Sequence, residues 1–407
     1  MKKICIFIVA IFVISNAYAG TYAGLPGTFL NWGAGARSLG MGKAFVGLAE
    51  DSTSTYWNPA GLSYLLTEEI TGLHAFLFES TNYDFISYAQ PLKNLGGIGL
   101  GVVILSSTGF EEINQYGEII GSFYDLEAAV LLSYGMNILK DLSLGSTFKV
   151  VYQQILSYEG VGAGVDIGFL YKPFEFLNLG GNIQNIIAPR IKLKDEMDTY
   201  PLNFRFGVAL KLLDSNLSLT NDIEKTLTSA FKFHVGLEYW LYPFIGIRGG
   251  LDETEVTAGI GLSYKGYGLD YAIASQSLGL SHRVSFTWVF SVFTVEVETN
   301  PKMFSPVGTK KEVEIKLKGG SKFGIRRWEL SIKDKTGTKV RRFEGKKQQP
   351  PSSIIWNGKD DNGSYVPDGK YSVELLLENK LGEVDTGSDS VQIETSLPGT
   401  TIQMEIK

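Results

Sequence analysis

The sequence contains very little cysteine and histidine. Its 407 residues include one cysteine, Cys5, and three histidines, His74, His234 and His282. Thiolate catalysis, disulfide scaffolding and cysteine-based zinc sites are therefore excluded, and no His/Asp/Glu cluster at metal spacing surrounds the histidines. No Ser/His/Asp arrangement can be assembled either. We accordingly expect no catalytic site, no metal site and no cofactor, and we predict that the protein is not an enzyme.

An excess of positive charge is also missing. The chain carries 37 basic and 43 acidic side chains, a formal net charge of −6, and its pI is about 5.4. Nucleic-acid binding normally needs a basic face, so we expect no nucleic-acid partner.

Long apolar runs are absent except near the start of the chain. Lys2 and Lys3 precede the apolar run at 4–14, and Ala17-Tyr18-Ala19 gives the small-x-small pattern that signal peptidase reads. An uncleaved membrane anchor is the alternative, but it needs roughly 18 apolar residues and this run is too short. We predict a signal peptide at 1–19, cleaved before Gly20, and an exported protein.

Charge is scarce in the first 293 residues compared with the rest. Residues 294–407 hold 19 basic and 17 acidic side chains, about 32%, whereas residues 1–293 hold 18 and 26, about 15%. Much of that larger surface is therefore expected not to face water. Without a spanning helix, the remaining way to cross a bilayer is a closed β-barrel, in which every backbone polar group finds a partner.

Period-two alternation supports the barrel. From 255 to 265, Val256, Ala258, Ile260, Leu262 and Tyr264 alternate with small or polar residues, which is a strand signature. Runs of this kind between turn signals predict fourteen strands within a transmembrane barrel at 67–293. They lie near 67–79, 82–92, 96–108, 122–137, 141–155, 160–173, 176–186, 201–212, 217–226, 231–241, 244–254, 255–266, 267–276 and 280–290.

Loop lengths agree with this topology. In an even-stranded barrel with both ends in the periplasm, connections after odd strands face outside and are the longer ones. The two longest, 109–121 and 187–200, follow the third and seventh strands. The alternative, a soluble antiparallel sandwich, would place a second polar surface outside and raise the charge density.

The segment at 20–66 precedes the first strand and has no regular period. It is too rich in glycine for a long helix, and Asn58-Pro59-Ala60-Gly61 predicts a turn. A phosphate-binding loop is not matched, because Ala44 stands at the Ser/Thr position and Arg37 at the first glycine. A dinucleotide fingerprint is not matched either, because no strand precedes the segment.

Residues 35–62 resemble the N-terminal segment of the FadL-like outer-membrane barrels, and more closely the PorV/PorQ group. The resemblance is carried by a Gly-Ala-Arg…Gly-Met-Gly…Ala-Phe-Val stretch and a Tyr-Trp-Asn-Pro-Ala-Gly stretch. The matching residues are Arg37, Gly40, Met41, Gly42, Phe45, Tyr56, Trp57, Asn58, Pro59, Ala60 and Gly61. The resemblance implies an all-β, fourteen-stranded barrel, with residues 20–66 as a hatch that plugs the lumen.

The FadL-like resemblance also concerns the third strand. The family's fatty-acid carriers have a kink there that opens the wall sideways. Gly96, Gly97, Gly99 and Gly101 stand in this strand and tolerate a bulge, so we predict a bulge at these positions.

Beyond the barrel, the sequence predicts a linker at 294–309 containing Pro301 and Pro306, a β-sandwich at 310–395 and a tail at 396–407. Short apolar runs separated by turn signals such as Asn362-Gly363 and Asp368-Gly369 predict the sandwich. This stretch resembles the immunoglobulin-like domain of FlgD in Trp328-Glu329-Leu330-Ser331-Ile332, Ile355-Trp356-Asn357-Gly358-Lys359-Asp360 and Pro367-Asp368-Gly369-Lys370-Tyr371. A calcium loop at 360–363 is disfavoured because Gly358 stands where an acidic ligand is required.

Three functions follow from these resemblances. PorV works in type IX secretion, which implies a protein-handling or scaffold role with secreted cargo or envelope proteins as partners. FadL-like carriers imply uptake of a hydrophobic small molecule such as a long-chain fatty acid. The third is an anchor for the immunoglobulin-like domain. Each implies a bacterial outer-membrane protein in contact with lipid, with its C-terminal domain in the periplasm.

Overall fold

The computed structural model describes residues 25–78, 80–92, 95–227, 229–276, 279–308 and 310–395. The predicted signal peptide, the first residues of the hatch and the predicted tail at 396–407 lie outside the described residues. The chain divides into two compact units, with the boundary between Ser291 and Val292. Each unit is described by itself below.

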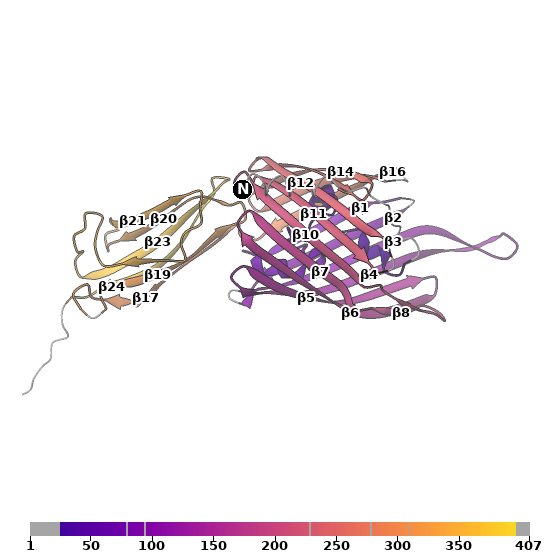
Figure 1. The fold of residues 1–407 in the computed structure, drawn as a ribbon, viewed down its shortest axis with the longest axis horizontal. Coiled ribbons are helices and arrows are strands. Elements are labelled where there is room, and N and C mark those ends of the chain that lie inside the picture. Colours follow the sequence, from indigo (N-terminus) through magenta and orange to yellow (C-terminus); the bar gives the residue numbers. More distant parts are fainter. Residues whose placement is uncertain are drawn as a thin grey trace, which may run out of the picture. The chain divides into compact units, whose positions relative to one another are not determined.

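The first unit is a closed antiparallel barrel of fourteen strands, in which β1 pairs with both β2 and β16 (Figure 1). Each predicted strand overlaps one barrel strand, so alternation alone located the wall correctly. The strands are β1 (Glu69–Phe76), β2 (Thr81–Pro91), β3 (Gly97–Ile113), β4 (Ile119–Leu139), β5 (Leu142–Ile155), β6 (Tyr158–Phe174), β7 (Leu177–Ile187), β10 (Asn203–Leu212), β11 (Leu217–Thr226), β12 (Phe231–Tyr242), β13 (Ile245–Asp252), β14 (Glu255–Tyr264), β15 (Tyr267–Gln276) and β16 (Gly279–Val289).

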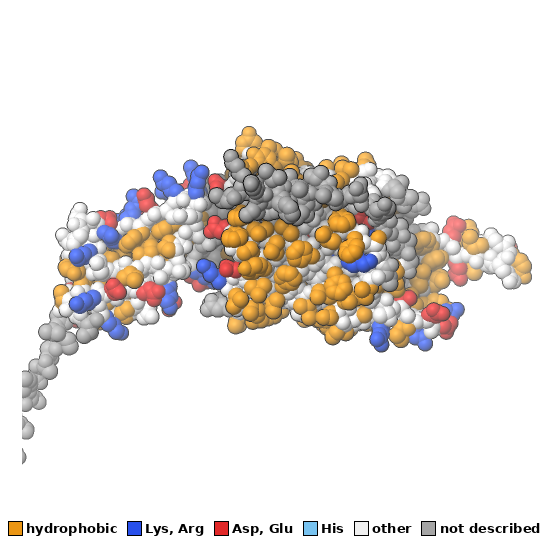
Figure 2. Space-filling view, viewed as in Figure 1, with side chains coloured by type: hydrophobic (Ala, Val, Ile, Leu, Met, Phe, Trp, Pro, Cys, Tyr) orange, Lys and Arg blue, Asp and Glu red, His pale blue; other side chains and the backbone are white. Residues whose placement is uncertain are grey.

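The barrel wall is apolar outside and polar inside. Along β4, Val130, Leu132 and Tyr134 are exposed on the outer face, and Leu132 is 58% exposed. The inner face buries charge, as at Glu238 and Arg205. Figure 2 shows hydrophobic side chains spread over the visible outer wall. This distribution suits a barrel surrounded by lipid, because successive side chains of a strand point to opposite faces.

Two connections contain structure that alternation did not predict. β3 and β4 continue past their neighbours into the predicted loop at 109–121, where they form a hairpin that extends beyond the rest of the barrel (Figure 1). The predicted loop at 187–200 contains the hairpin of β8 (Arg190–Lys192) and β9 (Met197–Thr199). Ile191 of this hairpin is fully buried. Pro189, just before the hairpin, packs closely against Gly164 of β6, so that a Cβ on Gly164 would collide with the proline ring.

The second unit is a two-layer β domain, as predicted. One sheet has the order β17-β19-β22 and the other β18-β24-β23-β20-β21. Trp356 lies in its core, edge-on to Phe304 and Tyr371 at ring-centroid distances of 5.7 and 5.5 Å. The strands are β17 (Phe293–Asn300), β18 (Met303–Phe304), β19 (Val313–Ser321), β20 (Ile325–Lys333), β21 (Lys339–Lys346), β22 (Ser353–Trp356), β23 (Gly369–Asn379) and β24 (Val384–Ile393).

The predicted linker at 294–309 is wrong, because most of it belongs to this domain. β17 pairs with β19 over its whole length, and β18 pairs with the end of β24. Asp389 of β24 accepts hydrogen bonds from the backbone N–H and the hydroxyl of Thr299, at 2.7 and 2.9 Å, and pairs with Lys302. The two prolines suggested a linker, but Val295 and Val297 alternate with glutamates, which is strand chemistry.

Candidate functional site

The N-terminal segment lies inside the barrel (Figure 1). From residue 25, where the described part begins, it forms four short helices, η1 (Thr28–Asn31), α2 (Ala36–Gly40), α3 (Ser54–Trp57) and η2 (Pro59–Tyr64). α2 packs against β13–β16 on one side of the wall, and η2 packs against β2–β6. Nearly every residue from 33 to 62 is buried. In the part of the chain that the structure describes, no helix is long and apolar enough to cross a membrane.

Glycines on the inner face of the wall let this hatch approach closely. A Cβ on Gly145 would collide with the backbone of Pro59 and Ala60, and a Cβ on Gly207 would lie 2.6 Å from the Gly47 nitrogen. Backbone atoms cannot move aside as a side chain can, so the contact requires glycine. The same holds elsewhere around the wall, at Gly135, Gly180, Gly236 and Gly250.

Arg37 of α2 joins the hatch to β12 through a bidentate ion pair. Its Nη2 lies 2.6 Å from Oε2 of Glu238, and its Nε donates to Oε1 of the same carboxylate at 2.8 Å. Glu238 also accepts from Nε of Arg248 on β13 at 2.8 Å, and Arg248 pairs with Asp270 on β15 at 2.6 Å. These four residues, the Arg37 cluster, connect the hatch to three strands of the wall.

Glu50 and Asp51 complete the charge balance around Arg37. Nη2 of Arg37 lies 3.0 Å from Glu50, and Nη1 lies 3.3 Å from Asp51. Glu50 also pairs with Lys211 of β10. Burial by itself would raise the pKa of Glu50, but the positive charges of Lys211 and Arg37 hold this pKa well below its ordinary value.

Two more acidic side chains of the wall hold the hatch. Both backbone N–H groups of Phe45 and Val46 donate to one carboxylate oxygen of Asp222, each at 2.8 Å. Lys43 pairs with Asp252 at 2.7 Å. The hatch therefore satisfies its backbone and charged groups against the wall, which a loosely inserted segment would not do.

The remaining motif residues form the packed centre of the hatch. Tyr56 and Trp57 are edge-on at 5.0 Å, and Phe45 lies 6.2 Å from Trp57. The predicted turn is confirmed by a hydrogen bond from Gly61 N–H to the Asn58 carbonyl at 3.0 Å. The side chain of Asn58 donates to the carbonyls of Val46 and Phe169, at 3.1 and 2.9 Å, and so ties this turn to β6.

The predicted bulge at Gly96, Gly97, Gly99 and Gly101 is wrong. β3 pairs continuously with β2 and with β4 from Gly97 to Ser107, and the register shifts lie further on, between Ser107 and Ile113. Gly97 and Gly99 face inward, where a Cβ would collide with Leu62 and Thr55 of the hatch. These glycines therefore provide room for the hatch, a role that glycine content alone does not distinguish from a bulge.

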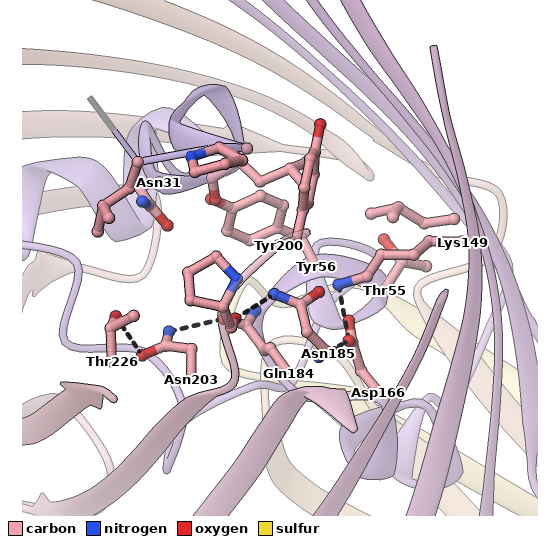
Figure 3. Close-up of a pocket in the computed structure, with 16 residues that line it drawn as sticks. Asn31, Thr55, Tyr56, Lys149, Asp166, Gln184, Asn185, Tyr200, Asn203 and Thr226 are labelled. Carbon is pink, nitrogen blue, oxygen red and sulfur yellow. Dashed lines mark hydrogen bonds and ion pairs between the residues drawn. The ribbon is translucent and has the colours of Figure 1, made fainter. Parts of the chain in front are cut away.

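A polar pocket lies between the hatch and the wall (Figure 3). Lys149 and Asp166 point toward one another and pair at 2.7 Å, and the Asn185 N–H donates to Asp166 at 2.7 Å. The space open to the centres of water molecules is about 40 Å³, which holds about three waters by the usual allowance per water. This pocket suits water rather than an apolar ligand.

The sequence does not show which wall residues contact the hatch. Asp222, Asp252 and Asp270 occupy ordinary polar positions of alternating strands, and the inward glycines occupy small positions on one face. The sequence does contain a signal for the close contact, because these glycines recur at the inward positions of their strands. Which hatch atom each one meets depends on the tertiary fold.

Family models match two parts of the chain. Residues 307–380 match the FlgD Ig-like domain, which agrees with the second unit. Residues 28–168 match an uncharacterised protein family (UPF0164), which includes most of the hatch and the strands β1–β5. A comparison with curated proteins finds no match.

Several solved β-barrel structures have a similar architecture at low sequence identity. The Ralstonia pickettii toluene transporter TbuX is 12% identical with a TM-score of 0.48, and the match covers 63% of this chain and 98% of that one. The Pseudomonas putida toluene transporter TodX is 13% identical with a TM-score of 0.46, covering 63% and 96%. A Pseudomonas aeruginosa FadL homologue is 11% identical with a TM-score of 0.45, covering 62% and 97%. Likeness at this level carries no argument about function. The chain is thus a plugged fourteen-stranded barrel followed by a domain similar to the FlgD Ig-like domain.

Proposed function

We propose that the chain is an outer-membrane protein of the PorV/PorQ type, in which a plugged barrel is the membrane anchor for a protein-handling or scaffold role. The observation that carries the proposal is the attachment of the hatch. Arg37, Lys43 and the backbone at 45–46 are joined to acidic residues of the wall, and inward glycines bring hatch and wall backbones into contact. A lumen filled in this way favours a static plug over a passage, and no enzymatic step is part of the proposal.

The outer face supports placement in a membrane. Exposed apolar side chains such as Leu132, Ile260 and Val284 cover the middle of the strands. On the same face, Asp84, Ser106 and Gln154 interrupt the apolar series toward one end. An apolar band bordered by polar residues is typical of outer-membrane barrels, whose band is roughly 25 Å tall.

Turn lengths support an orientation. The connections at 140–141, 175–176, 243–244 and 265–266, at the end of the barrel where the chain leaves β16, are short, whereas the opposite end has short turns at 156–157 and 253–254 but also the long connection at 188–202 and the extended β3–β4 hairpin. Short turns typically face the periplasm, so the second unit is proposed to be periplasmic and the long β3–β4 hairpin to face outside.

Uptake of a hydrophobic small molecule is the competing function. A carrier needs an apolar cavity that covers most of its ligand's surface. The pocket at Lys149 and Asp166 is polar and holds only a few waters. We therefore do not propose uptake of a hydrophobic molecule, and the experiment below is designed so that it would detect this function.

Native mass spectrometry of the full-length protein, extracted gently from its own outer membrane, tests the proposal. A protein adduct of tens of kilodaltons that survives extraction and dissociates at high salt is expected. An acyl-like adduct of a few hundred daltons, with no protein partner, would instead support the carrier. The Glu238→Gln variant is the matched sample, because loosening the Arg37 cluster should change occupancy by a luminal small molecule but not by a protein bound outside the lumen.

A further inference from the structure

The β3–β4 hairpin forms an arm that no other strand accompanies. The last pair between β2 and β3 is Thr81 with Ser107, and the last between β4 and β5 is Asp125 with Ile155. Pairing between β3 and β4 nevertheless continues to Ile113 and Ile119. Residues 108–124 are therefore a two-stranded ribbon, called the arm below. Its six residues at 108–113 reach roughly 20 Å beyond the wall at the usual rise of a strand.

The arm exposes large apolar side chains where no lipid band is expected. Tyr116 is 79% exposed, and Ile113, Ile119 and Ile120 are each about 60% exposed. On the outer face of β3 the apolar series ends at Ile104, after which Ser106 and Thr108 follow. Exposed apolar side chains gathered beyond the membrane-facing band are typical of a binding surface.

Both edges of the arm carry backbone groups without a neighbouring strand. In the described part of the chain, Thr108 N–H still reaches the carbonyl of Ser80, and beyond it no strand flanks either side. Only the tip is closed on itself, through Asn114 and Glu118. A long apolar edge strand of this kind is a template for an added strand.

Charge selects the kind of strand that can be added. The arm carries Glu111, Glu112 and Glu118, and no lysine or arginine occurs from 95 to 139. Among the described residues, no ion pair joins these three carboxylates to a basic side chain. A second copy of the arm would bring like charges together, which is unfavourable, whereas a basic strand would be attracted.

We propose that the arm is a docking strand for an extended, basic polypeptide segment of another protein. The segment adds to a free edge through backbone hydrogen bonds. Its apolar side chains pack against apolar side chains of the arm, and its lysines or arginines are attracted by the three glutamates. This inference rests on the proposed protein-handling function and names the partner chemistry and the place where the partner binds.

Binding of a model peptide tests the proposal on the full-length protein in phosphatidylcholine nanodiscs. The probe is a fluorescent decapeptide of alternating lysine and valine, with a glutamate–valine decapeptide as the charge control. A third peptide repeats the lysine–valine sequence with an N-methyl group on every residue, which removes the hydrogen-bond donors of both edges of an added strand but keeps the charge. Anisotropy at low salt should show binding of the first peptide and at least tenfold weaker binding of the other two.

The variant that removes the charge is Glu111→Gln, Glu112→Gln and Glu118→Gln combined. It is expected to weaken binding of the lysine–valine peptide at least tenfold. The matched control is Asp141→Asn with Glu175→Gln, two exposed acidic residues in turns at the other end of the barrel, and this variant should bind like the original chain. Equal binding of the N-methylated peptide, unchanged binding by the triple variant, or no binding of the first peptide would each overturn the proposal.

The two proposals fail separately. A protein adduct in native mass spectrometry together with no peptide binding would retain the protein-handling function and remove the arm as its site. Peptide binding that passes every control, together with an acyl-like adduct and no protein, would retain the arm as a docking strand and overturn the proposed function.

Discussion

The barrel and the C-terminal domain use the same alternating strands with opposite results. Leu132 of the barrel is 58% exposed, whereas Leu330 of the C-terminal domain is fully buried. The carboxylates differ as well, because both arginine partners of Glu238 lie inside the barrel, whereas Glu329 of the C-terminal domain pairs with two side chains that are exposed to water, Lys339 and Arg342. Alternation creates two faces, and the solvent on each side decides which face becomes the core.

The largest expected effect concerns the contact between hatch and wall. Gly145→Val places side-chain atoms where the hatch backbone lies, so we expect loss of the folded barrel, beyond the usual overpacking cost of about 1–3 kcal/mol. Gly72→Val is the control, because a Cβ there has no neighbour within 4 Å. Heat-modifiable migration on a gel measures the folded fraction. An equal folded fraction for the two variants would contradict the close contact between the hatch backbone and Gly145.

The next comparison sets one carboxylate against another, each bridging two basic side chains. Glu238→Gln removes the buried carboxylate that Arg37 and Arg248 share and leaves them only their other acidic partners, so we expect a loss toward the lower end of the roughly 3–5 kcal/mol usual for a broken buried ion pair, in the free energy of unfolding of the barrel. Glu329→Gln breaks ion pairs whose basic partners are exposed and screened by water, and should cost about 1 kcal/mol in its own domain. Denaturant unfolding in detergent, followed separately for each unit, measures both. Similar losses would contradict the assignment of the Arg37 cluster as the interior anchor.

An arginine on the outer face tests where the lipid lies. Leu132→Arg is expected to destabilise the barrel in a bilayer by about 2–4 kcal/mol, the usual cost of a cation near the midplane. Ile120→Arg is matched in exposure, 59% against 58%, but lies on the arm and should leave stability unchanged. Reversible folding into lipid vesicles measures the difference. A barrel destabilised equally by both would place the arm inside the lipid.

The smallest effect is a pH dependence in the C-terminal domain. Partial burial opposes ionisation of Asp389, but Lys302 and the hydrogen bonds from Thr299 lower its pKa to about 2. The unfolded chain has a pKa of about 3.9, so Asp389 contributes its full stability above pH 4 and loses it as the pH falls toward 2. Thermal unfolding against pH should show a shallower acid slope for Asp389→Asn. Asp385→Asn, an exposed neighbour on β24, should keep the original slope.

Much of the fold could be predicted from local pattern. Fourteen strands followed from alternation, and the turn at Asn58 followed from residue type, because both depend on neighbours in sequence. β17 was missed although its alternation is clear, since Pro301 and Pro306 suggested a linker. Its pairing with β19 is a contact between segments, which a reading of one segment at a time does not contain.

The candidate site was predicted as a segment but not as a set of contacts. Residues 35–62 were placed as a hatch by their resemblance, and the hatch lies inside the barrel. Its partners Glu238, Asp222 and Asp252 are about 180 to 210 residues away along the chain. Alternation places each of them on the polar face of its strand but does not show which residue of the hatch it contacts.

The sequence by itself determined the strands, the division into two regions of different charge density, and the plug segment. Local propensity and composition are sufficient for the strands and the division, since each concerns residues that are close in the chain, whereas the plug segment is identified by its resemblance to the FadL-like barrels. Only the tertiary structure decided which glycines admit the hatch, which carboxylates hold it, and that β3 and β4 leave the wall as an arm. These outcomes arise when the barrel closes, because closure brings distant strands around one segment and leaves part of another without neighbours.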